Sequence, residues 1–287
     1  MKYIITIIVI AVVAILSILL LKSSSPDREA HIFTPETKIT HGHGLASVGE
    51  DLYIATHHGL LVLKNEVDLY RVGSARDDYM GFSAHPDEAG TFFSSGHPAS
   101  GGNIGFQKSE DGGITWKKIS NGGSAGPVDF HAMSVSDADV NVVYGWYQGN
   151  IHRSDDAGVS WTVMPTGFPV VHLTTDRSDA HVVYASSPLG FYRSKDAGAS
   201  WEQLLDGFIA TSALSPRGEL FVVSETKGFA KSADNGMTWQ RLDTDFQGET
   251  PLFISFGKDG LSSAHLLTEK NSVYKSVDNG MTWNKIR

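Results

Sequence analysis

The segment "SEDGGITW" at residues 109–116 decides the fold, because four similar segments follow it along the chain. They read "SDDAGVSW" at 154–161, "SKDAGASW" at 194–201, "SADNGMTW" at 232–239 and "SVDNGMTW" at 276–283. Their shared pattern, called the box below, is Ser-x-Asp-x-Gly-x-(Thr/Ser)-Trp. Successive box tryptophans are 45, 40, 38 and 44 residues apart. A spacing near 40 residues is typical of a structural repeat.

Each repeat unit contains several short apolar segments. In one unit they are "FHAMSVS" at 130–136, "NVVYGWY" at 141–147 and "NIHRS" at 150–154, and a last strand begins at the tryptophan that ends the box. Four short strands in each unit of about 40 residues are typical of a β-propeller blade. The sequence therefore predicts an all-β, six-bladed β-propeller whose first blade has no box. The predicted blades are 41–73, 74–120, 121–165, 166–206, 207–244 and 245–287.

The boxes are expected to be structural. The aspartate is expected to accept hydrogen bonds from backbone N–H groups two residues on and to fix an Asx-type turn. The glycine suits a backbone position with positive φ, and the tryptophan offers a large apolar surface for packing between blades. The residues are Asp111, Asp156, Asp196, Asp234 and Asp278, with Trp116, Trp161, Trp201, Trp239 and Trp283.

The boxes resemble those of the Asp-box (BNR) β-propellers, which include sialidases, sortilin-type domains, photosystem-assembly propellers and xyloglucan hydrolases. The strings "HGLA", "THHGL", "GHPA" and "DFHAM" are also similar to those of bacterial membrane-anchored or secreted Asp-box proteins that carry a glycosyl-hydrolase label. The resemblance covers about residues 41–287. It implies a propeller whose ligand face lies opposite the boxes, and it supplies no catalytic residue.

Composition excludes several classes of protein. The 287 residues include no cysteine, which excludes a disulfide scaffold, a zinc ribbon and a cysteine nucleophile. The formal net charge of -9, without a basic stripe, argues against a nucleic-acid partner.

A sialidase needs three arginines around its substrate, and only Arg76 is well placed for that role, so sialidase activity is not expected. A general glycosidase needs only two carboxylates beside a cleft. An extracytoplasmic, glycosyl hydrolase-like enzyme therefore stays an alternative, with candidate acids Asp77, Asp78, Asp129, Glu225 and Glu249.

The N-terminal segment is expected to differ from the propeller. Residues 3–21 form an uncharged apolar run, long enough to cross a bilayer as a helix. Lys2 precedes the run, which places the propeller outside the cytoplasm. The predicted organisation is a transmembrane signal-anchor at 1–22, a linker with a candidate ring-closing strand at 23–40, and the propeller at 41–287. The alternative is a cleaved signal, whose apolar core is normally about 7–15 residues, and a secreted protein.

Ring closure has two candidate segments. Residues 31–40 could add an outer strand to the last blade, but 283–287 already fits that position, so the sequence leaves ring closure open.

Histidines gather in the first three predicted blades. Their first strands align as "HGHGLAS" from 41, "DYMGFSA" from 78 and "DFHAMSV" from 129, which makes His43, Met80 and His131 equivalent. Residues two positions apart on a strand share a side, and loops that carry further histidines are expected on the same face. We therefore expect one site, formed by His41, His43, His57, His58, His97, His131, Met80, Asp78 and Asp129.

Imidazole ligands suit zinc, copper, nickel and iron, and a thioether favours copper. The pattern thus indicates a binding or assembly module with a copper or zinc site, whose partners are the membrane through 3–21 and a protein or glycan ligand on the propeller face. If the histidines only fill space between blades, the chain is instead a protein-interaction platform without metal. Trp146 and Tyr147 are expected either to wall a ligand or to pack at the rim.

Overall fold

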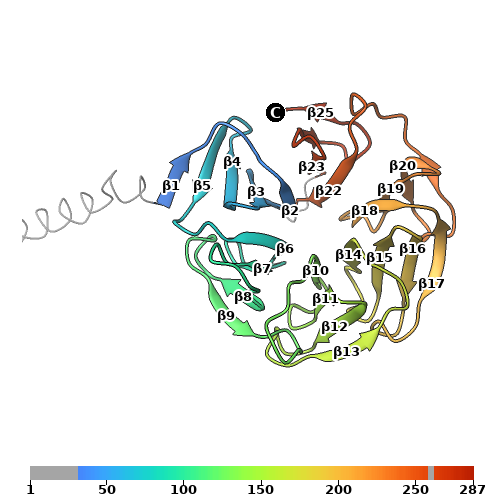
Figure 1. Cartoon of the computed structure of the whole chain (residues 1–287). Coiled ribbons are helices and arrows are strands. Elements are labelled where there is room, and N and C mark those ends of the chain that lie inside the picture. The colour runs from blue at the N-terminus through green and yellow to red at the C-terminus, as the bar shows by residue number, and fades with distance from the viewer. Residues whose placement is uncertain (1–31, 258–261) are drawn as a thin grey trace, which may run out of the picture.

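The computed structural model describes residues 32–257 and 262–287 (Figure 1). In those two ranges, no helix is long and apolar enough to cross a membrane. The predicted transmembrane segment at 3–21 lies outside the described residues and stays a prediction.

The described chain forms six antiparallel sheets around a central axis, which confirms the predicted six-bladed β-propeller (Figure 1). Blade 1 contains β1 (Phe33–Pro35), β2 (Gly42–Val48), β3 (Asp51–Thr56), β4 (Gly59–Lys64) and β5 (Asp68–Val72). Blade 2 contains β6 (Asp78–Ala84), β7 (Phe92–His97), β8 (Phe106–Ser109) and β9 (Lys117–Ser120). Blade 3 contains β10 (Ala132–Val135), β11 (Val143–Tyr147), β12 (Asn150–Ser154) and β13 (Thr162–Pro165).

The other three blades repeat the four-stranded order. Blade 4 contains β14 (His172–Thr175), β15 (Val183–Ser187), β16 (Gly190–Ser194) and β17 (Glu202–Asp206). Blade 5 contains β18 (Ile209–Leu214), β19 (Leu220–Ser224), β20 (Gly228–Ser232) and β21 (Gln240–Arg241). Blade 6 contains β22 (Pro251–Phe256), β23 (Ala264–Thr268), β24 (Val273–Ser276) and β25 (Asn284–Lys285).

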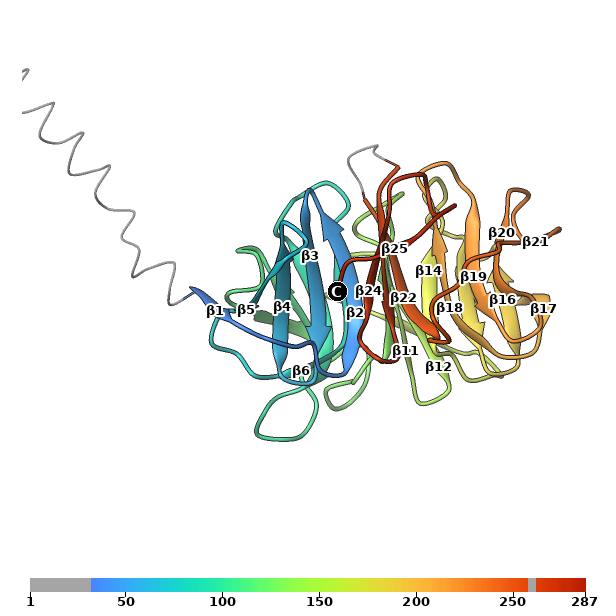
Figure 2. The same ribbon diagram turned by 90° about the horizontal axis from the view of Figure 1, so that it is seen from above.

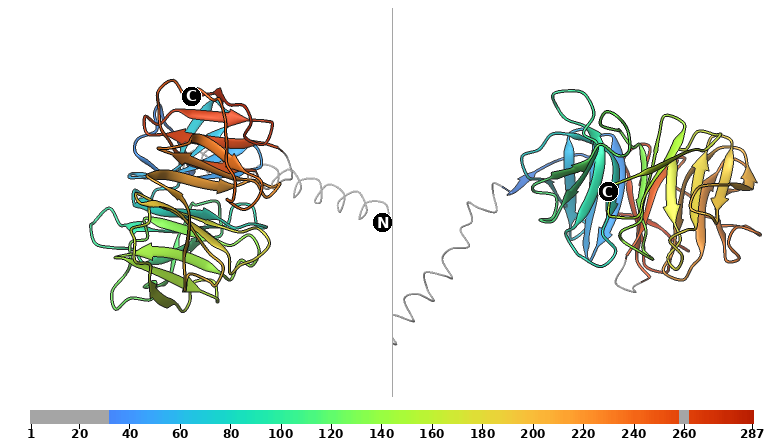
Figure 3. Two further views of the ribbon diagram at one scale, coloured as in Figure 1. Left: turned by 90° about the vertical axis from the view of Figure 1, so that its right-hand side faces the viewer. Right: turned by 90° about the horizontal axis from the view of Figure 1, so that it is seen from below.

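The first strand of each four-stranded unit lies nearest the axis (Figure 1). The strands run between the two faces of the ring (Figures 2 and 3). Because neighbouring strands are antiparallel, the boxes and the turns between first and second strands share one face, called the box face. The connections between second and third strands, and those between blades, lie on the opposite face, called the loop face. The two faces thus separate the boxes from the predicted site.

Each box is closed by a repeated set of hydrogen bonds. In 194–201, the Ser194 hydroxyl donates to Asp196 Oδ1 and accepts the N–H of Gly198, both at 2.8 Å. The N–H of Ser200 donates to Asp196 Oδ1 at 2.8 Å, and its hydroxyl donates to Oδ2 at 2.6 Å. The other boxes repeat these contacts. The prediction that the aspartate accepts the N–H two residues later was wrong. That N–H belongs to the box glycine and donates to the serine hydroxyl instead.

The boxes also join neighbouring blades. Gly158 has a φ of +88°, and a Cβ there would lie 2.0 Å from the ring of Phe106 in the preceding blade. Trp161 packs on the same ring, with centroids 5.2 Å apart. A side chain on Gly113 would likewise meet Leu60 of blade 1 at 2.2 Å. The box glycine and tryptophan therefore fit blade against blade, as the predicted packing role requires.

The sequence left ring closure open between two candidate segments, and the structure places both. Strand β1 pairs with β5, with Thr34 opposite Arg71, and so adds a fifth, outer strand to blade 1 rather than to blade 6. In blade 6 the outer position is already occupied by β25. Blades 6 and 1 are joined by side chains, since the N–H of Ser47 donates to Ser255 Oγ at 2.9 Å and Arg287 donates to the carbonyl oxygen of Thr37 at 2.8 Å.

We predict that Gly158→Ala destabilises the protein more than Gly167→Ala. Gly167 has a similar φ of +78°, but a Cβ there would meet nothing within 4 Å. The difference isolates the contact with Phe106, and overpacking of this kind costs about 1–3 kcal/mol. Urea unfolding of the two variants measures it, and equal losses would show that the box glycine does not set the contact between blades.

We also predict acid sensitivity that originates in the boxes. The hydrogen bond from the Ser200 hydroxyl lowers the pKa of Asp196 to about 2. Because an unfolded aspartate has a pKa of about 3.9, this carboxylate stabilises the fold above that value and the stabilisation is lost as pH falls towards 2. Asp196→Asn should flatten the fall of the urea midpoint between about pH 4 and pH 2, whereas Asn at the exposed Asp87 should leave it unchanged. Identical curves for wild type and Asp196→Asn would contradict this origin.

Candidate functional site

The structure divides the predicted site into two clusters on the loop face. Cluster 1 is defined by His43, His57 and Asp78, and cluster 2 by His97, Asp129 and His131. In each cluster, one nitrogen or carboxylate oxygen from every residue lies within 4.8 Å of the others. His41, His58 and Met80 belong to neither cluster, so a single nine-residue site does not form.

The clusters are related by the repeat, and each straddles two blades. His57 and His97 both lie five residues beyond equivalent positions, Leu52 and Phe92, at the start of the second strand. Each of them meets an aspartate at the beginning of the next blade. The third residue comes from the earlier blade in cluster 1 and from the later blade in cluster 2.

Cluster 1 is built on irregular backbone. The pairing of β2 with β3 shifts register between Gly42 and Gly44, so His43 lies at a bulge, which redirects its side chain. Asp78 Oδ2 lies 2.5 Å from His57 Nδ1. Asp78 Oδ1 lies 3.6 Å from His43 Nε2, too far for a hydrogen bond. The His43 and His57 rings meet edge to face with centroids 4.3 Å apart.

Cluster 2 surrounds a buried carboxylate. Asp129 is only 6% exposed, and its Oδ2 lies 2.6 Å from His131 Nε2 and 2.9 Å from His97 Nε2. His97 Nδ1 lies 2.8 Å from the carbonyl oxygen of Gly102 and must donate to it, since a carbonyl only accepts. A neutral His97 ring then presents its Nε2 lone pair to a carboxylate, which is favourable only with a proton or a cation present. Metal-bound histidines commonly donate their second ring N–H to a backbone carbonyl in this way.

Three polar atoms of the clusters have no hydrogen-bond partner within the described chain. They are Nε2 of His43, Oδ1 of Asp78 and Oδ1 of Asp129, and all are buried. A buried polar atom without a partner costs about 1–3 kcal/mol. Around a tetrahedral metal with bonds of about 2.0–2.2 Å, ligand atoms lie about 3.3–3.6 Å apart. The 3.6 Å between His43 Nε2 and Asp78 Oδ1 matches that spacing, whereas the contacts of 2.5–2.9 Å have hydrogen-bond lengths and would lengthen around an ion.

The protonation of two histidines differs between the clusters. Burial lowers the pKa of His43 to about 4, against the attraction of Asp78, so the ring is neutral near pH 7 and its nitrogen lone pair is available. In cluster 2 the hydrogen bond with Asp129 raises the pKa of His131. A metal ion would therefore compete with protons less in cluster 1 than in cluster 2.

One cavity of about 470 Å³ borders both clusters. Its lining includes His43, Met80, Asp129 and His131 from blades 1 to 3, and apolar and aromatic side chains together with Gln148 from blades 3, 4 and 6. Met80 thus lies on the wall shared by the clusters although it belongs to neither. The apolar side contains Trp146, Tyr147, Val170, Val171 and Phe253.

Trp146 and Tyr147 line the cavity and are also held in place. Trp146 Nε1 donates to Thr166 Oγ1 at 3.2 Å, and the indole packs on the core between blades 3 and 4. The Tyr147 hydroxyl accepts a hydrogen bond from the Gln148 amide at 3.1 Å. The two expected roles, cavity wall and rim packing, therefore coincide.

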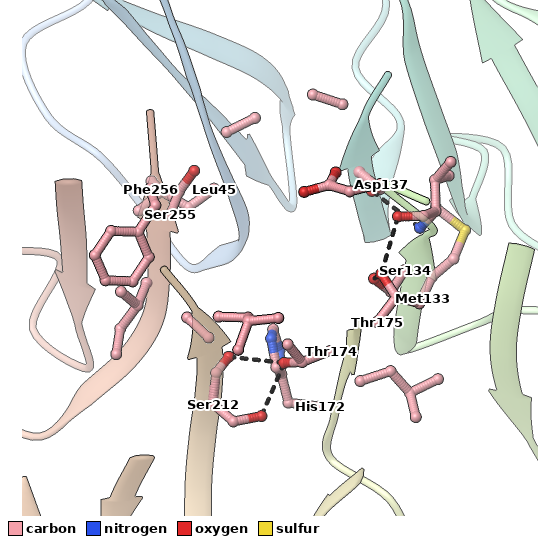
Figure 4. A pocket seen from close by; sticks show the side chains of 18 of the residues that line it. Leu45, Met133, Ser134, Asp137, His172, Thr174, Thr175, Ser212, Ser255 and Phe256 are labelled. Atoms are coloured by element: carbon pink, nitrogen blue, oxygen red, sulfur yellow. Dashed lines mark hydrogen bonds between the residues drawn. The ribbon is translucent and has the colours of Figure 1, made fainter. Parts of the chain in front are cut away.

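Two smaller spaces are lined by residues of the first strands. A space of about 40 Å³ lies among His43, Met80, His131, His172 and Phe253. A further space of about 140 Å³ is lined by the first strands of all six blades (Figure 4). There the Thr174 hydroxyl lies 2.9 Å from that of Ser212, which links blades 4 and 5.

His172 also lines the axial spaces and is not among the predicted site residues. Burial lowers its pKa to about 4, and its ring centroid lies 6.1 Å from that of Phe253. The signal was present in the alignment, because His172 follows Val171, the residue equivalent to His43 and His131.

The other selected residues have different surroundings. His41 is exposed, with its ring centroid 5.0 Å from that of His57, and His58 is exposed beside it. Among the candidate acids, Asp77 accepts the N–H of Ala99 at 3.0 Å, and Glu249 accepts hydrogen bonds from Thr268 and Ser272. These contacts give Asp77 and Glu249 structural roles.

Comparisons with solved structures support the fold. The chain is similar to a Niastella koreensis GH74 enzyme (TM-score 0.63, 14% identity, 88% of this chain and 46% of that one). It is also similar to the GH74 xyloglucanase from Xanthomonas campestris (TM-score 0.56, 18% identity, 74% and 38%). A structure of YCF48 bound to a D1 peptide matches over 88% of this chain and 84% of that one (TM-score 0.55, 15% identity).

These identities show a shared fold. The chain spans less than half the length of the GH74 enzymes it resembles. No family model and no curated protein sequence matches it.

Proposed function

We propose that the chain is a membrane-anchored, extracytoplasmic Asp-box β-propeller that acts as a binding or assembly module with a metal site on its loop face. Residues 3–21 are the proposed anchor. Cleavage after this segment would instead give a secreted protein. The observation that carries the proposal is the pair of His/His/Asp clusters beside one cavity, with three buried polar atoms that lack partners in the described structure.

The donor set supports zinc or copper. Two imidazoles and one carboxylate are ligands that first-row transition metals accept, and three protein ligands leave a coordination position open. Met80 lies on the same cavity wall and supplies a thioether, which favours copper. Each cluster would hold one ion, with Asp78 or Asp129 as the anionic ligand.

A binding or assembly role is supported by position and by likeness. The clusters lie at the loop face, away from the boxes that pack the blades together. The YCF48 structure with a D1 peptide shows that a propeller of comparable length takes a peptide ligand. A protein or glycan is accordingly the proposed partner of this face.

The first test is metal stoichiometry. Full-length protein in detergent is incubated with zinc or copper, desalted exhaustively, and analysed by mass spectrometry of the elements. We expect about two ions per chain, one lost in His43→Ala and one in His131→Ala, because each removes a ligand of one cluster. Metal should also raise the melting temperature of the wild type.

The matched control is His181→Ala, which removes an exposed histidine of the box face that contacts Asp179. It should retain both ions. Absence of bound metal in the wild type, or equal loss in the control, would overturn the metal site. If the histidines only fill space, His43→Ala would lower stability without any change in metal content.

A hydrolase is the second candidate, and the arrangement of Asp78 and Asp129 favours it. Asp129 lines the cavity, Asp78 contacts His43 on the same wall, and each carboxylate has one oxygen without a hydrogen-bond partner in the described chain. Two carboxylates beside one cavity are what glycoside hydrolysis requires.

A hydrolase of this kind should release reducing sugar from polysaccharides such as xyloglucan. Asp129→Asn should lower the turnover rate by at least about a hundredfold, as loss of an acid or base catalyst does. The control is Asp77→Asn, since Asp77 bonds a backbone N–H. Turnover that survives Asp129→Asn and Asp78→Asn would exclude these carboxylates as catalysts.

A further inference from the structure

The cavity at the loop face has two chemically different walls. One wall presents His43, Asp129 and His131 with the thioether of Met80. The opposite wall is apolar and is formed by blades 3, 4 and 6. A volume of about 470 Å³ falls within the range of small-molecule sites, about 300–1,000 Å³.

The apolar wall is open to solvent and is preformed. Val171 is 39% exposed although it lies beside the buried Val170. Trp146 is fixed by the hydrogen bond that its indole donates, and Tyr147 by the hydrogen bond that its hydroxyl accepts. Exposed apolar groups in a concave site are stabilised when a ligand covers them, so this wall fits a ligand with a flat apolar body.

The charge of the wall that contains the histidines and Asp129 determines which polar group the ligand carries at its other end. No lysine or arginine of the described residues lines the cavity. Without metal, the carboxylates of Asp78 and Asp129 would repel an anion. With a divalent ion in a cluster, the ion outweighs its single carboxylate, and its open coordination position accepts an oxygen donor.

We infer that this cavity binds an organic carboxylate with a flat apolar body, and that the carboxylate completes the coordination of a metal ion held by the clusters. The body packs against Trp146, Val171 and Phe253. The neighbouring space of about 40 Å³, which shares His43, Met80, His131 and Phe253 with the cavity, is too small for such a body. The inference rests on the proposed function, because the metal supplies the positive charge.

The test uses naphthalene carboxylate as the probe and its uncharged amide as the matched compound. Full-length protein in nanodiscs is prepared with and without zinc, and bound metal is counted in every sample. Quenching of tryptophan fluorescence reports binding, since Trp146 lines the cavity and the box tryptophans lie on the other face. The carboxylate should bind the metal-loaded protein at least about tenfold more tightly than the metal-free protein, whereas the amide should gain nothing from metal.

Two valines of similar exposure provide the matched variants. Val171→Glu places a carboxylate in the cavity and should weaken naphthalene carboxylate binding at least about tenfold without loss of metal. Val163→Glu alters a side chain that is 41% exposed on β13, outside the cavity lining, and should bind like the wild type.

The outcomes separate the two proposals. If metal is retained but the carboxylate gains no affinity from it, or if both valine variants behave alike, the ligand inference is overturned and the metal site stands. An equal gain for the amide overturns the requirement for an anion. If no metal is retained, the metal site and the ligand inference both fail.

Discussion

The constraint on which the rest of the structure depends is the closed turn of the box. Its aspartate accepts both the N–H and the hydroxyl of the residue four positions later, while its serine holds the N–H of the glycine. This geometry gives the glycine its positive φ and brings it directly against the preceding blade. Because five turns repeat the contact on one face, blade packing there does not depend on the loops of the other face.

The loop face can therefore carry groups that a packing surface would exclude. The connections that carry His57 and His97 bring a histidine of one blade to an aspartate of the next, at junctions 1–2 and 2–3. A bulge at His43 completes cluster 1, and His131 of the later blade completes cluster 2. At the following junction the equivalent of His57 and His97 is Gln148, and no acidic residue stands in the place of Asp78. Three of the buried polar atoms without partners in the described residues lie in these two clusters. A bound ion would offset the free-energy cost of leaving these atoms without hydrogen bonds. Metal binding would therefore stabilise the fold as well as supply the proposed function.

The sequence predicted the fold well because a repeated, locally closed turn has a fixed spacing and a fixed role. Ring closure was harder to predict, since the placement of β1 depends on which blade leaves an outer edge free, and 31–40 and 283–287 both fitted the outer edge of blade 6. The alignment of first strands placed His43, Met80 and His131 on one cavity. It did not reveal two clusters, because the conformations of the His57 and His97 connections decide which aspartate each ring meets. His172 was missed because it lies one position after the aligned column of His43 and His131, where the first three blades have only small residues.

The central claim is that both clusters bind metal ions through the residues identified here. Anomalous X-ray diffraction at the zinc edge, from crystals of the propeller region soaked in zinc, tests it most directly. The account predicts two peaks at the loop face, each within about 2.0–2.2 Å of two histidine nitrogens and one aspartate oxygen. Empty clusters, with anomalous peaks only at exposed acids of the box face, would contradict it.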